Sequence, residues 1–379
     1  MVKPGISNLT KNQTVSKRIP NLTSIRFILA FFVVIFHISE FSKNRNFPYY
    51  DALAIFHKGT EAVYVFFTLS GFLIIKQLFL EKKYTNTINL KKFYLRRVLR
   101  IFPLYYLVLT FGFLYYHLIL PFFGFKFEND YDLLFGLLLS ITFFSNIFST
   151  YSPGGILEIL WSIGVEEQFY ILVAPLVRLL PIKRIIIFLT TFTLIYFLIY
   201  FSENVIFFKK YHMAFFYFSF GGLCSILLEY AFFQTLIKKL KFTVLLIFIL
   251  YFTTPIFINN LNPLLYNLFS FLLFGLTMSV LAIQPITFLE NRILNYLGKI
   301  SYGIYMYHAI ILQLTGYIYL KVISKMNFPN YMDIIIINLL VIVITVIVAH
   351  FSYKYYEGYF LKLKRNYEMK LKILPQKVS

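Results

Sequence analysis

An arginine and a histidine enclose a long apolar stretch near the start of the chain. Residues 26 to 37 read RFILAFFVVIFH, so Arg26 and His37 are separated by ten residues of which every one is apolar. On a helix, His37 would lie roughly 17 Å from Arg26, near the middle of a membrane when Arg26 marks its boundary. An ionisable group at that depth usually marks a pathway or a catalytic site. His37 is therefore a candidate general base in a partly hydrated cavity; the alternative is a histidine that packs by bonding a backbone carbonyl.

Two adjacent carboxylates form the second unusual feature. Glu166 and Glu167 lie in the string WSIGVEEQFY. Neighbouring residues on a helix point in different directions, so only one of the pair can face a given partner. We expect Glu166 to hold the imidazole of His37 in one tautomer and to stabilise its protonated form, which is the orienting role in base catalysis. A structural ion pair with an arginine is the alternative.

Basic residues gather in the string KKFYLRRVLRIFP, where Arg97 and Arg100 are three residues apart. That spacing puts both side chains on one face of a helix. Two guanidinium groups on one face suit a phosphate-bearing ligand, because each can bind an oxyanion through two hydrogen bonds. The alternative is a topology signal that contacts anionic lipid headgroups.

The remaining histidines are less informative. His308, in SYGIYMYH, is a second intramembrane histidine, expected near the cytoplasmic third of a late span. His57, His117 and His212 are expected at the surface, in loops or at span ends, and His350 at the cytoplasmic interface. No metal site is predicted, because no predicted helix carries a pair of His, Asp or Glu residues four apart and no H-E-x-x-H motif occurs.

Composition shows which elements must position these residues. Of 379 residues, 59% are hydrophobic and 14% charged, which is typical of a polytopic membrane protein. The net charge of +20 does not indicate nucleic-acid binding, because the Lys and Arg residues collect between apolar spans. We expect a cytoplasmic leader at residues 1–22, one transmembrane domain at residues 23–353 and a basic cytoplasmic tail at residues 354–379.

Eleven apolar segments are candidates for spans of about 20 residues. They lie near residues 25–42, 61–80, 101–122, 132–150, 160–180, 184–201, 211–231, 242–258, 264–284, 301–321 and 333–352. Eleven crossings would put Lys238, Lys239, Lys241 and the tail outside, against the positive-inside rule. We therefore expect an all-α transmembrane bundle of about ten spans with both termini inside, and one short or re-entrant segment between residues 132 and 180. The weakest stretch is residues 151–169, where Pro153, Gly154 and Gly155 interrupt the helix.

Five strings in order along the chain resemble the membrane-bound acyltransferases of the acyltransferase-3 group. They are RFILAFFVVIFH at 26–37, FFTLSGFLI at 66–74, the paired arginines with RIFPLYY after them, WSIGVEEQFY at 161–170 and LGKISYGIYMYH at 297–308. The resemblance implies transfer of an acyl group, most often acetyl from acetyl-CoA, to a hydroxyl of a cell-surface or lipid-linked carbohydrate. It also implies residence in the bacterial cytoplasmic (inner) membrane, in contact with membrane lipids.

The resemblance also assigns roles. It makes His37 the leading catalytic residue and attributes function to Glu166, Arg26, Arg97 and Arg100, the arginines as donor-binding groups. Two departures stand out. Tyr64 occupies the position where many relatives carry an acidic residue, so no acid is assigned there. The proline that usually follows the C-terminal glutamate is absent after Glu357, which leaves the role of that glutamate open.

Two mechanisms fit this pattern. In the first, His37 removes the proton of the acceptor hydroxyl as it attacks, and Tyr302 or Ser162 stabilises the oxyanion. In the second, His37 itself carries the acyl group. A transporter or flippase of a lipid-linked sugar is the main alternative function, although no inverted repeat is found in the sequence. An inactive sensor or scaffold on the same fold is the third.

Overall fold

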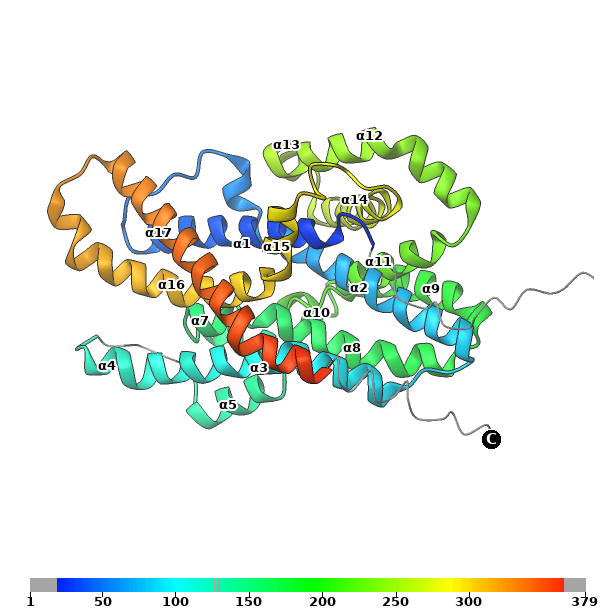
Figure 1. Ribbon diagram of the computed structural model, residues 1–379, viewed down its shortest axis with the longest axis horizontal. Helices are drawn as coiled ribbons and strands as arrows, with labels where there is room; N and C mark the ends of the chain where they lie inside the picture. Colours follow the sequence, from blue (N-terminus) through cyan, green and yellow to red (C-terminus); the bar gives the residue numbers. More distant parts are fainter. Residues whose placement is uncertain (1–18, 126, 128–129, 365–379) are drawn as a thin grey trace, which may run out of the picture.

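The computed structural model describes residues 19–125, 127 and 130–364 of the chain, and within them it is a bundle of helices without a strand (Figure 1). The predicted all-α fold is confirmed. Residues 1–18 of the predicted leader and the part of the predicted tail from residue 365 lie outside the described residues. The main helices are α1 Leu22–Asn44, α2 Gly59–Thr85, α3 Leu90–Leu114, α8 Trp161–Leu179, α9 Ile185–Tyr200, α11 Phe215–Leu227, α12 Ala231–Thr253, α14 Pro263–Ile283, α16 Ser301–Lys321 and α17 Asn330–Phe351.

Seven helical stretches are long and apolar enough to cross a membrane. They are Leu22–Asn44, Gly59–Thr85, Leu90–Phe122, Ile182–Tyr200, Pro263–Ile283, Ser301–Met326 and Asn330–Lys364. The protein is therefore a polytopic integral membrane protein. Helices α8, α11 and α12 occupy three further segments that were expected to cross, so the number of about ten spans stays a prediction.

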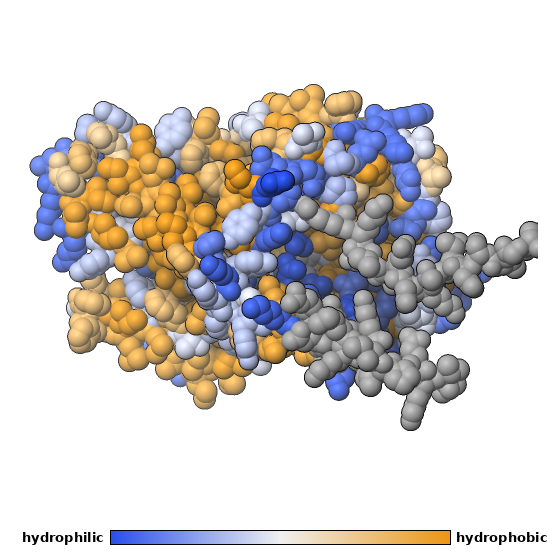
Figure 2. All heavy atoms as spheres, in the orientation of Figure 1, coloured by the Kyte–Doolittle hydropathy of each residue, from blue (hydrophilic) through white to orange (hydrophobic). Residues whose placement is uncertain are grey.

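The exterior agrees with a lipid environment. On α17 the side chains of Leu339, Val343, Ile347 and Phe351 follow one another at intervals of four residues, and each is about half exposed. This spacing puts them on one face of the helix. Figure 2 shows a broad apolar surface over α16 and α17, as expected for helices that contact lipid tails.

Two helices begin earlier than the hydrophobic pattern predicts. Helix α3 starts at Leu90, because the side chain of Asn89 accepts a hydrogen bond from the backbone N–H of Lys92 at 2.9 Å and caps the helix. Arg97 and Arg100 consequently lie inside α3, in agreement with the prediction that one helix carries them both. Helix α12 likewise contains the basic residues that were placed in a loop: Lys238, Lys239 and Lys241.

The predicted interruption between residues 132 and 180 exists, but most of it precedes the expected stretch. Helix α5 (Leu133–Ile141) has 9 residues, fewer than half of the roughly 20 that a crossing needs. Short helices α6 (Ser145–Phe148) and α7 (Gly155–Glu158) follow, with positive φ angles at Phe143, Ser152 and Gly154. Residues 161–179, in contrast, form the regular helix α8, so the interruption covers only the first half of the predicted weak stretch.

Helices α2 and α11 are in direct backbone contact. A Cβ atom at Gly71 would lie 1.9 Å from the carbonyl oxygen of Phe218, and one at Gly221 would lie 2.1 Å from that of Thr68. Only glycine permits this approach, which is a common way to pack membrane helices. Ser70, the neighbour of Gly71, points elsewhere and lines a cavity. Gly71 therefore packs one face of α2 against α11, and Ser70 lies on the neighbouring face of α2, which lines the cavity.

Three other elements complete the framework. Helix α15 (Arg292–Lys299) packs against the start of α1, and α10 (Ile206–Lys210) and α13 (Ile256–Asn260) are short connections. After α3 the chain continues through a π-helical turn, Tyr115–Ile119, into α4 (Leu120–Phe122); after α17 it continues through a second one, Ser352–Glu357. The second π turn brings the buried Glu357 beside Gly303 of α16.

Candidate active site

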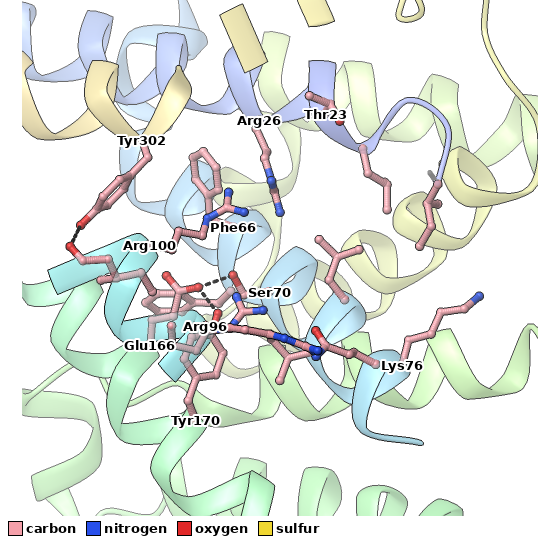
Figure 3. A pocket seen from close by; sticks show the side chains of 18 of the residues that line it. Thr23, Arg26, Phe66, Ser70, Lys76, Arg96, Arg100, Glu166, Tyr170 and Tyr302 are labelled. Atoms are coloured by element: carbon pink, nitrogen blue, oxygen red, sulfur yellow. Dashed lines mark hydrogen bonds between the residues drawn. The ribbon is translucent and has the colours of Figure 1, made fainter. Parts of the chain in front are cut away.

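A large cavity opens between α1, α2, α3, α8 and α16 (Figure 3). Its volume is about 1230 Å³. Seven basic and two acidic side chains line it: Arg26, Lys76, Lys92, Arg96, Arg97, Arg100 and Lys364, with Glu81 and Glu166. The lining therefore carries a surplus of positive charge at the point where five helices meet, in a protein with few charged residues.

The three predicted donor-binding arginines meet in this cavity. Figure 3 shows Arg26 reaching in from α1 and Arg100 from α3. Arg26 interacts electrostatically with both Arg97 and Arg100, and the guanidinium of Arg97 lies 5.5 Å from the ring centre of Tyr170. Among the described residues, none of these three arginines forms a salt bridge with a carboxylate. The packing thus leaves a set of repelling cations that an anionic ligand would neutralise.

Glu166 belongs to this cavity and not to the histidine. Its Oε1 accepts a hydrogen bond from the hydroxyl of Ser70 at 2.5 Å and another from the hydroxyl of Tyr170. The prediction that Glu166 orients His37 is wrong, because the carboxylate faces the arginines from α8. Glu167 points the other way, as expected for adjacent helical residues. It is buried, and its Oε1 has no hydrogen-bond partner among the described residues.

His37 and His308 form a pair between α1 and α16. His37 Nδ1 lies 3.0 Å from the carbonyl oxygen of Val33 and 3.3 Å from His308 Nε2. His308 Nδ1 lies 2.5 Å from the carbonyl oxygen of Tyr305. His308 is completely buried and His37 half-buried. The two rings therefore lie at the same depth in the bundle. The prediction that His308 lies nearer the cytoplasmic side than His37 is wrong.

Tyr305 connects the histidine pair to the cavity. Neither histidine lines the cavity, whereas Tyr305 does, and its hydroxyl lies 2.7 Å from that of Ser162 in the cavity wall. At about 100° per residue, His37 lies within about 20° of Arg26 around α1, three turns farther along. Since Arg26 faces the cavity, His37 projects from the same side of the helix beyond it.

The two predicted oxyanion donors are occupied. The hydroxyl of Tyr302 donates to the carbonyl oxygen of Ile101 at 3.0 Å, and Ser162 is bonded to Tyr305. Both residues line the cavity, but neither contacts His37 among the described residues. A role for Tyr302 would require its present hydrogen bond to break, so the structure gives this residue no support as an oxyanion donor.

The other histidines differ in their surroundings. His57 is exposed, as predicted, and bonds the carbonyl oxygen of Asp51 at 2.8 Å. His212 lies in the turn before α11, at the predicted span end, and its half-buried ring lies 5.0 Å from that of Trp161. In the described part of the chain, no group of three or more His, Cys, Asp or Glu residues could hold a metal ion.

The remaining two histidines, His117 and His350, each contact the hydroxyl of a tyrosine. His117 contacts the hydroxyl of Tyr131 at 3.0 Å and His350 that of Tyr296 at 2.5 Å.

Glu357 accepts a hydrogen bond from Ser352 at 3.2 Å and interacts electrostatically with Arg100. The glutamate therefore lies behind the cavity and supports one of its arginines.

Three site residues were not singled out from the sequence, although the strings quoted above contain them. Tyr170 lies four residues after Glu166, and Tyr305 three residues before His308, so each shares a helix face with a predicted residue. Ser70 precedes the glycine that contacts α11. Helical spacing from residues already chosen would have found the two tyrosines, but nothing local identifies the partner of Ser70.

Comparison with known proteins agrees with this arrangement. An acyltransferase domain matches residues 19–353. The chain is 24% identical over 279 residues to a protein of Acidianus two-tailed virus named putative acetyltransferase ORF330, covering 70% of this chain and 76% of that one. It is 24% identical over 372 residues to the peptidoglycan O-acetyltransferase OatA of Listeria monocytogenes, covering 90% of this chain and 55% of that one.

A third similarity, 32% identity over 130 residues, is to an uncharacterised protein of Haemophilus influenzae and covers 32% of this chain and 49% of that protein. The chain therefore spans about half the length of two of these relatives. No solved structure matches it. Since the acyltransferase domain covers nearly the whole membrane bundle and includes every residue of the site except Lys364, the chain belongs to this family of acyltransferases.

Proposed function

We propose that this membrane acyltransferase moves an acetyl group from acetyl-CoA to a hydroxyl of a cell-surface or lipid-linked carbohydrate. The observation that carries the proposal is the group of Arg26, Arg97 and Arg100, which form no salt bridge within the described part of the chain and line a large cavity next to a pair of histidines. The relative named peptidoglycan O-acetyltransferase supports the same reaction class. Family membership favours an enzyme over a transporter or flippase.

The cavity suits the donor. Its volume of about 1230 Å³ exceeds the roughly 300–1,000 Å³ of most small-molecule sites, as a large nucleotide-containing cofactor requires. Arg26, Arg97 and Arg100 would hold phosphate oxygens through charge-assisted hydrogen bonds. The positive-inside rule would place this basic mouth, and both termini, on the cytoplasmic side of a bacterial inner membrane, where acetyl-CoA is made.

The chemistry would take place at His37. In the direct route, Nε2 of His37 takes the proton of the acceptor hydroxyl while the oxygen attacks the thioester carbonyl. The carbon–sulfur bond then breaks, and the thiolate of coenzyme A receives the proton back from the imidazolium. In the two-step route, Nε2 attacks the thioester carbonyl, the carbon–sulfur bond breaks and the thiolate of coenzyme A leaves. The acceptor hydroxyl then attacks the acyl carbon, the bond from that carbon to Nε2 breaks, and the hydroxyl proton passes to the thiolate. Both routes use the same nitrogen.

Purified protein in lipid nanodiscs would test this proposal. We expect acetyl-CoA to be consumed, with release of the free thiol, only when acceptor is present, and His37→Ala to abolish release. His57→Ala, an exposed histidine outside the bundle, is the matched control and should keep wild-type turnover. Wild-type turnover by His37→Ala would refute the catalytic assignment, and no thioester turnover by the wild type would favour a transporter or an inactive scaffold.

A cellular experiment tests the proposed carbohydrate acceptor. Mass spectra of surface glycans from wild-type and deletion strains should differ by the mass of one acyl group on one glycan. That difference would identify both the acyl group and the acceptor. Identical glycan spectra would contradict a surface carbohydrate as acceptor and direct the search to small lipid-linked molecules.

A further inference from the structure

We infer that His308 is a positioning residue that keeps the proton of His37 on Nδ1, so that Nε2 of His37 is the free base. The inference deepens the proposed function, since it rests on His37 as the reacting group. It follows from three contacts of the ring nitrogens. Two are with backbone carbonyl oxygens, and the third joins the two rings. When both rings are neutral, these contacts permit only one arrangement of protons.

Two of the contacts involve backbone carbonyl oxygens, which can only accept a hydrogen bond. His37 Nδ1 lies 3.0 Å from the carbonyl oxygen of Val33, and His308 Nδ1 lies 2.5 Å from that of Tyr305. Both Nδ1 atoms must therefore carry a hydrogen. Each carbonyl belongs to the same helix as its histidine, one turn earlier, so α1 and α16 each set the tautomer of their own ring.

The third contact is consistent with this assignment. A neutral imidazole carries one N–H, so a hydrogen on Nδ1 of His308 leaves its Nε2 as an acceptor. That atom lies 3.3 Å from Nδ1 of His37, which has a hydrogen to donate. The N–H of His37 is thus shared between Val33 and His308, and all three contacts join one donor with one acceptor.

The other proton arrangements each lose a contact. With its hydrogen on Nε2, His37 would turn a lone pair toward the Val33 oxygen and toward the Nε2 lone pair of His308. A doubly protonated His308 would bring N–H against N–H. It would also be a completely buried cation, and the contacts of its ring are with Tyr305 and His37 and with no carboxylate among the described residues.

The arrangement replaces the role that the sequence suggested for Glu166. Nε2 of His37 has no hydrogen-bond partner among the described residues and is free to take a proton or to attack. When it takes a proton, the imidazolium still donates its Nδ1 hydrogen to two acceptors, Val33 and His308. A neutral imidazole thereby stabilises the charge in a position where a carboxylate would have been costly to bury.

Two amide variants of His308 separate this role from packing. In His308→Gln, the longer side chain can place its oxygen near the position of Nε2 and still accept from His37. In His308→Asn, the shorter amide reaches only the position of Nδ1, so His37 loses that acceptor. We expect Asn to lower kcat about tenfold to a hundredfold, with the KM for acetyl-CoA unchanged, and Gln to restore most of the loss.

Nuclear magnetic resonance can locate the proton on the His37 ring without measuring activity. The protein would carry isotope-labelled histidine and be embedded in nanodiscs, and the signal missing from His37→Ala would be assigned to His37. We expect wild-type His37 to carry its proton on Nδ1 and His308→Asn to populate the Nε2 form. A wild-type proton on Nε2, or equal kcat for Asn, Gln and wild type, would overturn the inference. An active His37→Ala would instead overturn the proposed function while the proton assignment stood.

Discussion

Two clusters of charged side chains lie at opposite ends of α2, and they are built in opposite ways. At the first turn, Lys58 Nζ lies 3.4 Å from Glu61 Oε1 and donates to the hydroxyl of Tyr266 at 2.7 Å. The same hydroxyl donates to Glu61 at 2.7 Å, and the ammonium also lies 4.7 Å from the ring centre of Tyr251. The cluster is buried, neutral and closed.

In its second half, α2 contributes Ser70, Lys76 and Gln77 to the cavity. Here Arg26, Arg97 and Arg100 have no salt-bridge partner among the described residues, and Glu166 balances only part of their charge. Charges buried for packing come in neutral sets whose members bond one another. A surplus that the helices do not neutralise indicates a ligand. The contrast assigns structure to one cluster and binding to the other.

The largest effect is expected when one member of the closed cluster is removed, which tests whether this cluster stabilises the fold. Lys58→Met should leave the buried carboxylate of Glu61 unpaired and destabilise the protein by about 3–5 kcal/mol. The affinity of the folded fraction for acetyl-CoA should stay unchanged. Unfolding of nanodisc-embedded protein measures the first effect and calorimetric titration the second. The double variant Lys58→Met, Glu61→Leu is the control and should recover stability; a single variant as stable as the wild type would refute the structural role.

The next largest effect should come from the open cluster. Arg100→Met should raise the Kd for acetyl-CoA about tenfold to a hundredfold, since a hydrogen bond to a charged group contributes about 1.5–3 kcal/mol. Stability should not fall, because one repulsion among three arginines disappears. Calorimetric titration at fixed ionic strength measures the loss. Loss of stability with unchanged affinity would assign Arg100 to packing, like Lys58.

Glu166 provides a finer test. Glu166→Gln removes the negative charge but keeps an oxygen that can accept from Ser70 and Tyr170. The arginines would then attract an anion more strongly, and Kd should fall about threefold to fivefold, as expected for one charge interaction of roughly 1 kcal/mol. Titration of the non-acylated coenzyme avoids turnover. A rise in Kd of the same size would mean that the carboxylate itself binds the donor or holds an arginine in place.

The smallest effect should occur at the rim. Lys76 Nζ lies 3.6 Å from Glu229, and both side chains are about one-quarter exposed. Lys76→Gln should therefore raise Kd about twofold at low salt and have no effect at high salt, because exposed charges are screened. A salt series of titrations on wild type and variant checks this. An effect as large as that of Arg100→Met would move the donor site toward the rim.

The sequence predicts how deep a residue lies in the membrane better than it predicts which residues its side chain contacts. Apolar runs identified the seven helical stretches that are long and apolar enough to cross a membrane. Positive-inside reasoning put Arg26, Arg97 and Arg100 at one level, where the cavity brings them together. Rotation about each helix axis was the missing quantity. Glu166 and His37 were both intramembrane, yet α8 turns the carboxylate toward Ser70, while α16 brings His308 to the imidazole.

Helix ends were the other source of error. The start of α3 depends on one cap at Asn89, which overrides the boundary suggested by hydropathy. The depth assigned to His308 was measured from span boundaries alone, while its real partner is set by how α16 packs on α1. The cap at Asn89 is local in the sequence, whereas the contact between α16 and α1 joins segments far apart in the chain and leaves no local pattern.

The order in which the cavity walls occur along the chain bears on biosynthesis. Arg26, Arg97, Arg100 and Glu166 are translated within the first half of the protein, and α2 can pair with α11 through Gly71 once residue 227 is inserted. Tyr305 and His308 emerge much later, with α16. A chain still on the ribosome could thus assemble its basic pocket but lack the partner of His37. Catalytic competence would appear only after α16 has been inserted, when the helices before it are already embedded in the membrane.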